Sequence, residues 1–139
     1  MIVLDTNVIS ELMKPQPDMR VVDWLDSQSS EVCYLTSVVL AELLNGIELL
    51  PEGRRKRDLS DALSDIVQEM IQDRVLAFDA KMAGTFATIY SVAKAKGVNV
   101  GFADCQIAAS ALVNGYAVAT RDELPFKAMG CVTINPWTS

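Results

Sequence analysis

The chain opens with the stretch Met1-Ile2-Val3-Leu4-Asp5-Thr6-Asn7, an apolar run that ends in three residues able to cap a helix. A short run that is apolar at every position predicts a strand buried on both faces. The side-chain oxygens that follow predict a helix start, and this helix is expected to continue to about Met13, before Pro15 and Pro17. The stretch therefore predicts a buried strand that leads directly into a helix.

The same alternation of strand and helix recurs along the chain. Apolar runs predict further strands at residues 32–35, 75–78, 116–119 and 131–134, the last two joined by a short connection. Helices are expected around 21–25, over 57–72 and 82–95, and from Asp104 to about Val113. The segment 38–50 is strongly apolar and predicts a buried helix with Glu42 in its second turn. Apolar strands separated by helices indicate a doubly wound α/β fold around a parallel, five-stranded sheet.

Length and composition favour one compact domain over residues 1–139. Half of the residues are hydrophobic, and 139 residues suffice for a single core. Cys33, Cys105 and Cys131 are far apart, which favours neither a disulfide framework nor a zinc site and fits a cytoplasmic protein. No signal peptide or membrane span is recognisable, so no membrane association is expected.

The net charge of −6 argues against broad nonspecific binding to a polyanion. Basic residues nevertheless cluster at 54–57 (Arg-Arg-Lys-Arg), with a smaller pair at Lys94 and Lys96. Each cluster is either a solvated helix face or a local contact for nucleic acid. Trp24 and Trp137 are expected to pack in the core, because neither belongs to a basic and aromatic array.

Three carboxylates stand alone in otherwise uncharged stretches: Asp5 after 1–4, Glu42 within 32–47 and Asp104 within 98–119. Burying an unpaired carboxylate is unfavourable, so three of them in apolar elements predict a shared positive partner. The chain contains no histidine, and carboxylates with water are the ligands that Mg²⁺ or Mn²⁺ prefers. The sequence therefore predicts a divalent metal site.

A fourth acid, Asp122, follows the predicted fourth strand through Thr120 and Arg121. Ligands of doubly wound folds lie beyond the carboxyl ends of the strands, where all four acids can meet. Simpler roles remain open: Asp5, Asp104 and Asp122 as helix caps or turn residues, and Glu42 in a salt bridge.

Neighbouring polar residues have two interpretations each. Thr6 and Asn7 either orient ligands and water or cap a helix, and Thr120 offers a hydroxyl to metal-bound water. Arg121 either contacts phosphate or neutralises the acids at rest. Asp79 is expected to be a plain N-cap.

Several of these motifs resemble the PIN-domain ribonucleases, above all the VapC and FitB toxins of bacterial type II toxin-antitoxin pairs. The resemblance rests on residues 1–10, the helix that bears Glu42, and three further motifs: Gly101-Phe102-Ala103-Asp104-Cys105-Gln106-Ile107-Ala108-Ala109, Ala119-Thr120-Arg121-Asp122 and Ile134-Asn135-Pro136-Trp137. It runs from Met1 to Trp137.

The resemblance implies an α/β/α sandwich, metal-dependent endoribonuclease activity and a homodimer. It further implies neutralisation by a cognate antitoxin that carries a DNA-binding domain, in assemblies that extend to operator DNA. The acids of the family's metal site fall on Asp5, Glu42, Asp104 and Asp122, with Thr120 at its hydroxyl position and Asn7 beside the first acid. One departure is that Asp122 occupies the place of an asparagine, and Pro125 stands where many relatives have a later aspartate.

Two other classes of function remain open. A phospho-acceptor receiver domain is also doubly wound and binds Mg²⁺, and Asp79 after the third strand invites that comparison. A non-catalytic binding domain would use the four acids only as caps.

Overall fold

The computed structural model describes residues 1–139 and contains one five-stranded sheet in the order β3-β2-β1-β4-β5. Every neighbouring pair of strands is parallel, which confirms the prediction. β2 has the predicted length but begins one residue later, and the other four strands are shorter than predicted. Their bounds are β1 (Ile2–Leu4), β2 (Cys33–Thr36), β3 (Val75–Leu76), β4 (Ala117–Ala119) and β5 (Thr133–Ile134).

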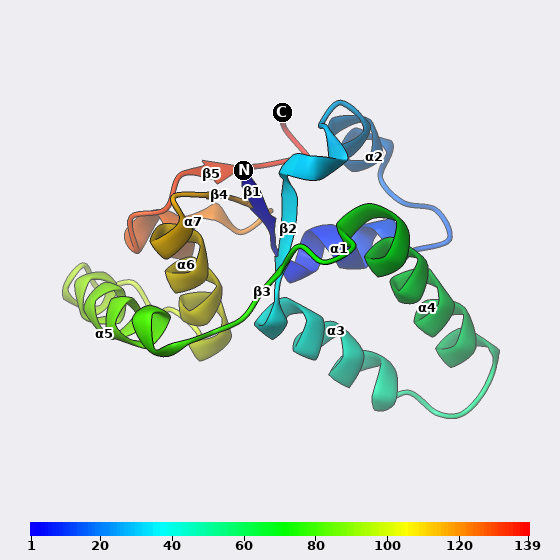
Figure 1. The fold of residues 1–139 in the computed structure, drawn as a ribbon, viewed down its shortest axis with the longest axis horizontal. Coiled ribbons are helices and arrows are strands. Elements are labelled where there is room, and N and C mark those ends of the chain that lie inside the picture. Colours follow the sequence, from blue (N-terminus) through cyan, green and yellow to red (C-terminus); the bar gives the residue numbers. More distant parts are fainter.

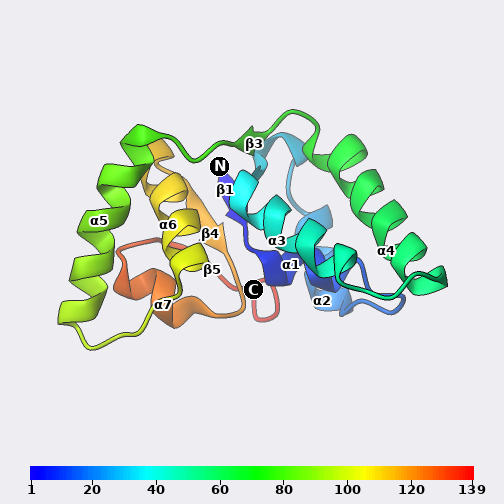
Figure 2. The same ribbon diagram turned by 90° about the horizontal axis from the view of Figure 1, so that it is seen from below.

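Seven α-helices flank this sheet: α1 (Thr6–Leu12), α2 (Met19–Asp26), α3 (Ser37–Glu48), α4 (Arg54–Asp65), α5 (Ala80–Ala95), α6 (Phe102–Asn114) and α7 (Glu123–Ala128). Figures 1 and 2 both show α5, α6 and α7 together on one side of the molecule and α1 to α4 on the other, with β1 and β2 between the two groups. This arrangement is the expected α/β/α sandwich.

The core lies between the sheet and the two helical layers. Its largest fully buried side chains come from strands and helices alike: Leu4, Ile9, Leu35, Ile71, Ile107 and Phe126. The three cysteines are buried and form no disulfide. No helix combines the length and the apolar character needed to cross a membrane.

The helix predicted at 38–50 is present as α3, but the prediction that it is buried is wrong. Only Val39, Leu43 and Ile47 are buried in α3, a stripe at intervals of four residues. The opposite face is open, and Leu44 is 53% exposed. Glu42 is exposed as well, so its isolation in the sequence does not reflect burial.

The segment predicted as one helix over 57–72 begins earlier and changes geometry. The basic run 54–57 forms the first turn of α4, and a π-helical segment (Ile66–Ile71) follows α4. Gln72 then has a positive φ of 59°, which ends the helical segment. The guanidinium of Arg74 donates to the carbonyls of Ser30, Cys33 and Met70 and so joins this segment to the start of β2.

The structure also gives the starts of α5, α6 and α7. α6 begins at Phe102, with Gly101 as its N-cap residue, so Asp104 lies within the first turn rather than at the helix start. The connection between β4 and β5 contains the unpredicted helix α7. Asp79 is the N-cap of α5, accepting a hydrogen bond from the Met82 N–H at 3.1 Å, as expected.

Candidate functional site

A polar cavity of about 430 Å³ lies at the carboxyl ends of β1 and β4. These strands are neighbours at the point where the strand order reverses, since β2 and β3 lie on one side and β5 on the other. One hydrophobic residue, Trp137, is among the eleven that line the cavity: Asp5, Thr6, Asn7, Ser10, Glu11, Lys14, Glu42, Asp104, Arg121, Asp122 and Trp137. The structure thus brings the four acids singled out from the sequence to one place.

Asp5 is the most buried of these four acids, at 5% exposure. It is the N-cap of α1: Oδ1 accepts from the Thr6 N–H and Oδ2 from the Thr120 hydroxyl, each at 2.8 Å. Burial raises the pKa of Asp5, the two hydrogen bonds oppose the rise, and the charges of Glu42 and Asp122 add to it. Asp5 therefore both caps α1 and lines the cavity.

Asp104 reaches the cavity from the first turn of α6 and accepts no hydrogen bond from the protein. Its pKa is raised to about 6, first by burial and then by the charges of Asp5, Glu42 and Asp122. All the charged groups that shift the pKa of Asp104 are thus carboxylates. The negative charges of the cavity act on one another, as they must when acids from distant segments meet.

Glu42 enters the cavity from α3 and is tied to the end of β1 through Thr6. The Thr6 hydroxyl donates to Glu42 Oε1 at 2.7 Å, while the Thr6 N–H is bonded to Asp5. No cation pairs with Glu42, so the salt bridge considered as its simpler role is absent. Thr6 connects two acids that lie 37 positions apart in the sequence, at 5 and 42.

Thr120 is fully buried and does not line the cavity. Its hydroxyl donates to Asp5 and accepts from Asn7 Nδ2 at 3.3 Å and from the Asp122 N–H at 3.1 Å. Asn7 Oδ1 accepts from the Arg121 N–H at 3.3 Å. In this structure Thr120 and Asn7 hold the loop after β4 against the start of α1.

Asp122 lines the cavity from the N-cap position of α7 but makes no capping hydrogen bond. The next acid, Glu123, is engaged elsewhere, because its Oε1 accepts from the Thr133 hydroxyl at 2.6 Å. Pro125 is buried in α7. Of the acids in this loop, Asp122 is the one that lines the cavity.

Sequence reasoning missed four lining residues: Ser10, Glu11, Lys14 and Trp137. A signal was present in the sequence, where Asn7, Ser10, Glu11 and Lys14 follow helical spacing along α1 and just beyond its end. Trp137 packs in the core as expected, being 5% exposed, and also forms part of the cavity wall. No sequence pattern connects it with the acids, which lie far away along the chain.

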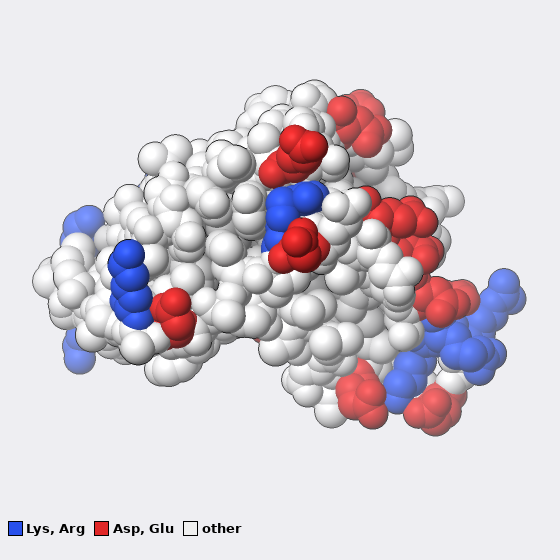
Figure 3. Space-filling model, viewed as in Figure 1, with Lys and Arg blue, Asp and Glu red and all other residues white.

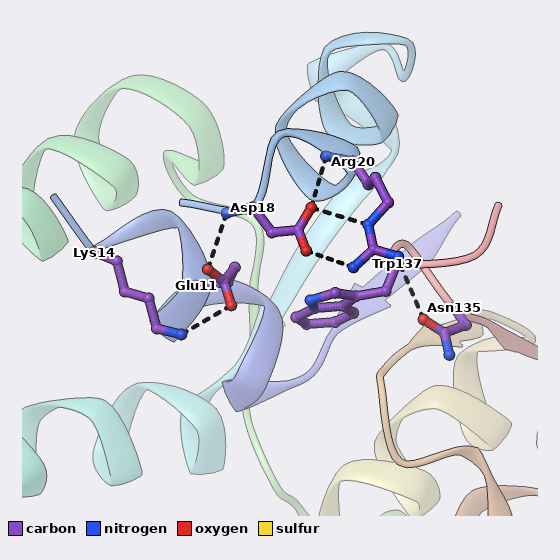
Figure 4. Close-up of polar contacts among 6 residues, drawn as sticks. All are labelled: Glu11, Lys14, Asp18, Arg20, Asn135 and Trp137. Atoms are coloured by element: carbon purple, nitrogen blue, oxygen red, sulfur yellow. Dashed lines mark hydrogen bonds and ion pairs between the residues drawn. The ribbon is translucent and has the colours of Figure 1, made fainter. Parts of the chain in front are cut away.

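Glu11 lies in the part of the cavity wall that α1 forms, and its hydrogen bonds stabilise that part. It is 6% exposed, and its oxygens accept from Lys14 Nζ and from the Asp18 N–H, each at 3.0 Å (Figure 4). The hydrogen bond from Asp18 is the main cause that lowers the pKa of Glu11. Asp18 in turn caps α2 and pairs with Arg20 at 2.7 Å, so these contacts connect α1 to α2.

The carboxylates suit a hard divalent cation by their chemistry and by their mutual repulsion. No three of them approach closely enough in the structure to hold an ion by themselves. This spacing fits Mg²⁺, which is commonly bound by one or two carboxylates and retains several waters. A fully dehydrated metal with four protein ligands would not fit.

Comparison with known proteins identifies the family. The PIN domain profile matches residues 2–130. The chain is 45% identical to the plasmid stability protein StbB of Pseudomonas syringae pv. tomato over 137 residues, covering 99% of both chains. It is 44% identical to the VapC ribonuclease Y4jK of Sinorhizobium fredii, covering 99% of this chain and 98% of that one.

A solved structure gives the same result. The crystal structure of FitAcB from Neisseria gonorrhoeae superposes with a TM-score of 0.92 at 43% identity, with all of both chains covered. Sequence and architecture therefore agree over the full length compared, and the chain belongs to the PIN domain family.

Proposed function

We propose that this protein is a Mg²⁺-dependent endoribonuclease and the toxin of a type II toxin-antitoxin pair, acting in the cytoplasm. The observation that carries the proposal is the single polar cavity lined by Asp5, Glu42, Asp104 and Asp122. The relative named a VapC ribonuclease and the one named toxin FitB, each 44% identical, support it.

In this proposal the four acids would surround Mg²⁺, one or two of them as direct ligands and the others through bound water, with Mn²⁺ as the alternative ion. When bound, such an ion supplies Lewis-acid chemistry that stabilises the charge developing on a phosphodiester. Asp104 accepts no hydrogen bond from the protein and is free to orient the attacking water and accept its proton. Asp5 is held by Thr6 and Thr120, which fixes its direction.

The decisive experiment measures cleavage of labelled RNA by the purified chain with Mg²⁺ and with EDTA. Cleavage is expected with Mg²⁺ but not with EDTA. Asp5→Asn should abolish cleavage while leaving the circular dichroism spectrum unchanged. Glu48→Gln changes an exposed acid of the same protein outside the cavity and serves as the control. Full cleavage by Asp5→Asn would refute the assignment.

The protein partner in this proposal is a cognate antitoxin with a DNA-binding domain. A second, larger cavity of about 950 Å³ lies between α1, α3 and α4 and adjoins the first, sharing Thr6, Ser10, Lys14 and Glu42 with it. Its apolar lining comes from Met13, Leu43, Ile47, Leu50 and Leu59. An apolar antitoxin segment would fit this groove, with an arginine reaching the neighbouring acids.

Higher assembly is the third part of the proposal. Solved complexes of similar chains include FitAB bound to an IR36 DNA fragment, at 42% identity and a TM-score of 0.92. We expect a homodimer of this protein that binds operator DNA only through its antitoxin. Light scattering of the free protein and gel shifts with and without the antitoxin test these two points.

The receiver-domain alternative gains no support from the site. Asp79 caps α5 and does not line the acidic cavity. The non-catalytic alternative requires the four acids to act as caps, but only Asp5 makes a capping hydrogen bond.

A further inference from the structure

Arg121 is a cation on the wall of an acidic cavity, yet it forms no ion pair. Its backbone N–H is bonded to Asn7, whereas its guanidinium makes no hydrogen bond within the protein. The chain's ion pairs involve other cations, Lys14, Arg20, Arg54, Lys56 and Lys127. Arg121 therefore does not neutralise an acid of the cavity through an ion pair.

Arg121 also lies near Asp18, whose pKa its charge helps to lower, but Asp18 already has a partner. Its two carboxylate oxygens accept from Arg20 Nε at 3.1 Å and Nη2 at 2.7 Å (Figure 4). The pKa of Asp18 is lowered to about 2, chiefly by its hydrogen bonds with Arg20 and least by Arg121. The donors of Arg121 thus remain available to a ligand.

The position of the Arg121 guanidinium is set by an aromatic ring. It lies over the indole of Trp137, 5.1 Å from the ring centroid. The indole is buried, and the backbone N–H of Trp137 donates to Asn135 Oδ1 at 2.9 Å, which holds the turn after β5 (Figure 4). A cation over an aromatic face is attracted to it while the N–H groups at the edge of the guanidinium stay free.

We propose that Arg121 contacts a phosphate of the RNA backbone and that Trp137 is the positioning residue that holds its guanidinium for this contact. The inference rests on the proposed ribonuclease function. Guanidinium groups bind phosphate through paired N–H donors, and a cation beside four carboxylates offsets their repulsion of an anionic substrate. Lys14, the other cation on the wall, is already paired with Glu11 at 3.0 Å.

The test measures binding of fluorescein-labelled, 12-nucleotide single-stranded RNAs of randomised sequence by fluorescence anisotropy. EDTA prevents metal-dependent cleavage, and the salt concentration is varied. Arg121→Gln should raise the dissociation constant about tenfold, as expected for loss of a charged hydrogen bond, and reduce the salt dependence by about one phosphate contact. Lys81→Gln removes the same charge from an exposed site outside the cavity and should leave the salt dependence unchanged.

Trp137 is tested by a double-mutant cycle. Trp137→Leu should weaken binding severalfold, whereas Trp137→Phe, which keeps an aromatic face, should bind nearly as well as the unchanged chain. Added to Arg121→Gln, Trp137→Leu should have no further effect. Equal weakening in both backgrounds would show that Trp137 is merely structural and would overturn its positioning role.

The two hypotheses fail in different ways. If the protein cleaves RNA with Mg²⁺ but Arg121→Gln binds RNA with unchanged affinity and salt dependence, the present inference is wrong and the ribonuclease stands. If the protein binds RNA through Arg121 but never cleaves it, the ribonuclease is wrong and the contact stands. Arg121 is exposed, so its variant tests the phosphate contact even if Trp137→Leu fails to fold.

Discussion

The hydroxyl of Thr120 donates a hydrogen bond to Oδ2 of Asp5 at 2.8 Å, and it joins the ends of two adjacent strands, β4 and β1. The same oxygen accepts from Asn7 and from the Asp122 N–H. One buried hydroxyl therefore orients the first acid of the cavity and shapes the loop that carries the fourth. Its removal would leave several polar groups without partners.

Thr120→Val retains the shape of the side chain but removes this hydroxyl. Because Asp5 is buried, the change should lower the free energy of unfolding by about 1–3 kcal/mol. Urea denaturation measures the loss, and Thr120→Ser, which keeps the hydroxyl, should recover most of it. Equal stability of the valine and serine variants would contradict this role.

The fold was predictable because its strands are apolar throughout and regularly separated by helices. Residues 1–4 and 116–119 showed the pattern needed for adjacent buried strands, and residues 5–7 showed the helix start. Helix α7 was missed because its six residues are too few to show helical periodicity. The π-helical segment was missed because its apolar spacing continues that of α4.

The site was predictable where an acid stands alone in an apolar stretch, as Asp5, Glu42 and Asp104 do. Burial was the wrong explanation for Glu42, because an apolar sequence does not reveal that one face of α3 stays open. The positions of Arg121 and Trp137 depend on contacts across the sheet edge. Such contacts leave no periodic signal in the sequence.

The second prediction concerns the pH dependence of stability. The pKa of Asp104 is raised from 3.8 to about 6, so the folded protein holds this proton more tightly than the unfolded chain. Without metal, the contribution of Asp104 to stability must fall as the pH rises from about 4 to about 6, and stays unfavourable above that. Asp104→Asn should therefore stabilise the metal-free protein near pH 7.5 and have less effect near pH 4.

Thermal melts of both proteins in EDTA at the two pH values measure this difference. Comparison with the unchanged chain removes the opposite contributions of Glu11, Asp18 and Glu123, whose pKa values are lowered. An asparagine variant less stable than the parent near pH 7.5 would show that Asp104 is not repelled by its neighbours.

A third prediction concerns Arg74, whose guanidinium donates to three carbonyls between the π-helical segment and β2. Arg74→Gln cannot reach all of them and should lower the free energy of unfolding by about 2–4 kcal/mol, since hydrogen bonds from charged groups are strong. Arg57→Gln is the matched control, because Arg57 is exposed and unpaired. Urea denaturation should show no more than a small effect for the control.

The fourth prediction concerns the basic run 54–57, which forms the first turn of α4. Lys and Arg side chains gather with acids at the lower right of Figure 3, the end of the molecule where Figure 1 draws α4. Cations are unfavourable at a helix N-terminus, so this placement does not serve the helix itself. Arg54 and Arg55 line the groove next to the acidic cavity. Replacing the exposed Arg54, Arg55 and Arg57 by alanine, and keeping Lys56, which donates to the Glu48 carbonyl and to Glu52, should weaken RNA binding and reduce its salt dependence without loss of thermal stability. An unchanged salt dependence would leave the run as a solvated helix face.

Metal binding gives the fifth prediction. Mg²⁺ that binds only the folded protein should raise its melting temperature in proportion to the logarithm of the ion concentration, once this exceeds the dissociation constant. Glu42→Gln should weaken Mg²⁺ affinity measured by calorimetry, and it should slightly stabilise the metal-free fold, because Glu42 adds to the repulsion at Asp5 and Asp104. Glu48→Gln removes an acid from the same helix outside the cavity and should change neither quantity. If both variants bind Mg²⁺ like the unchanged chain, Glu42 is not part of the metal site.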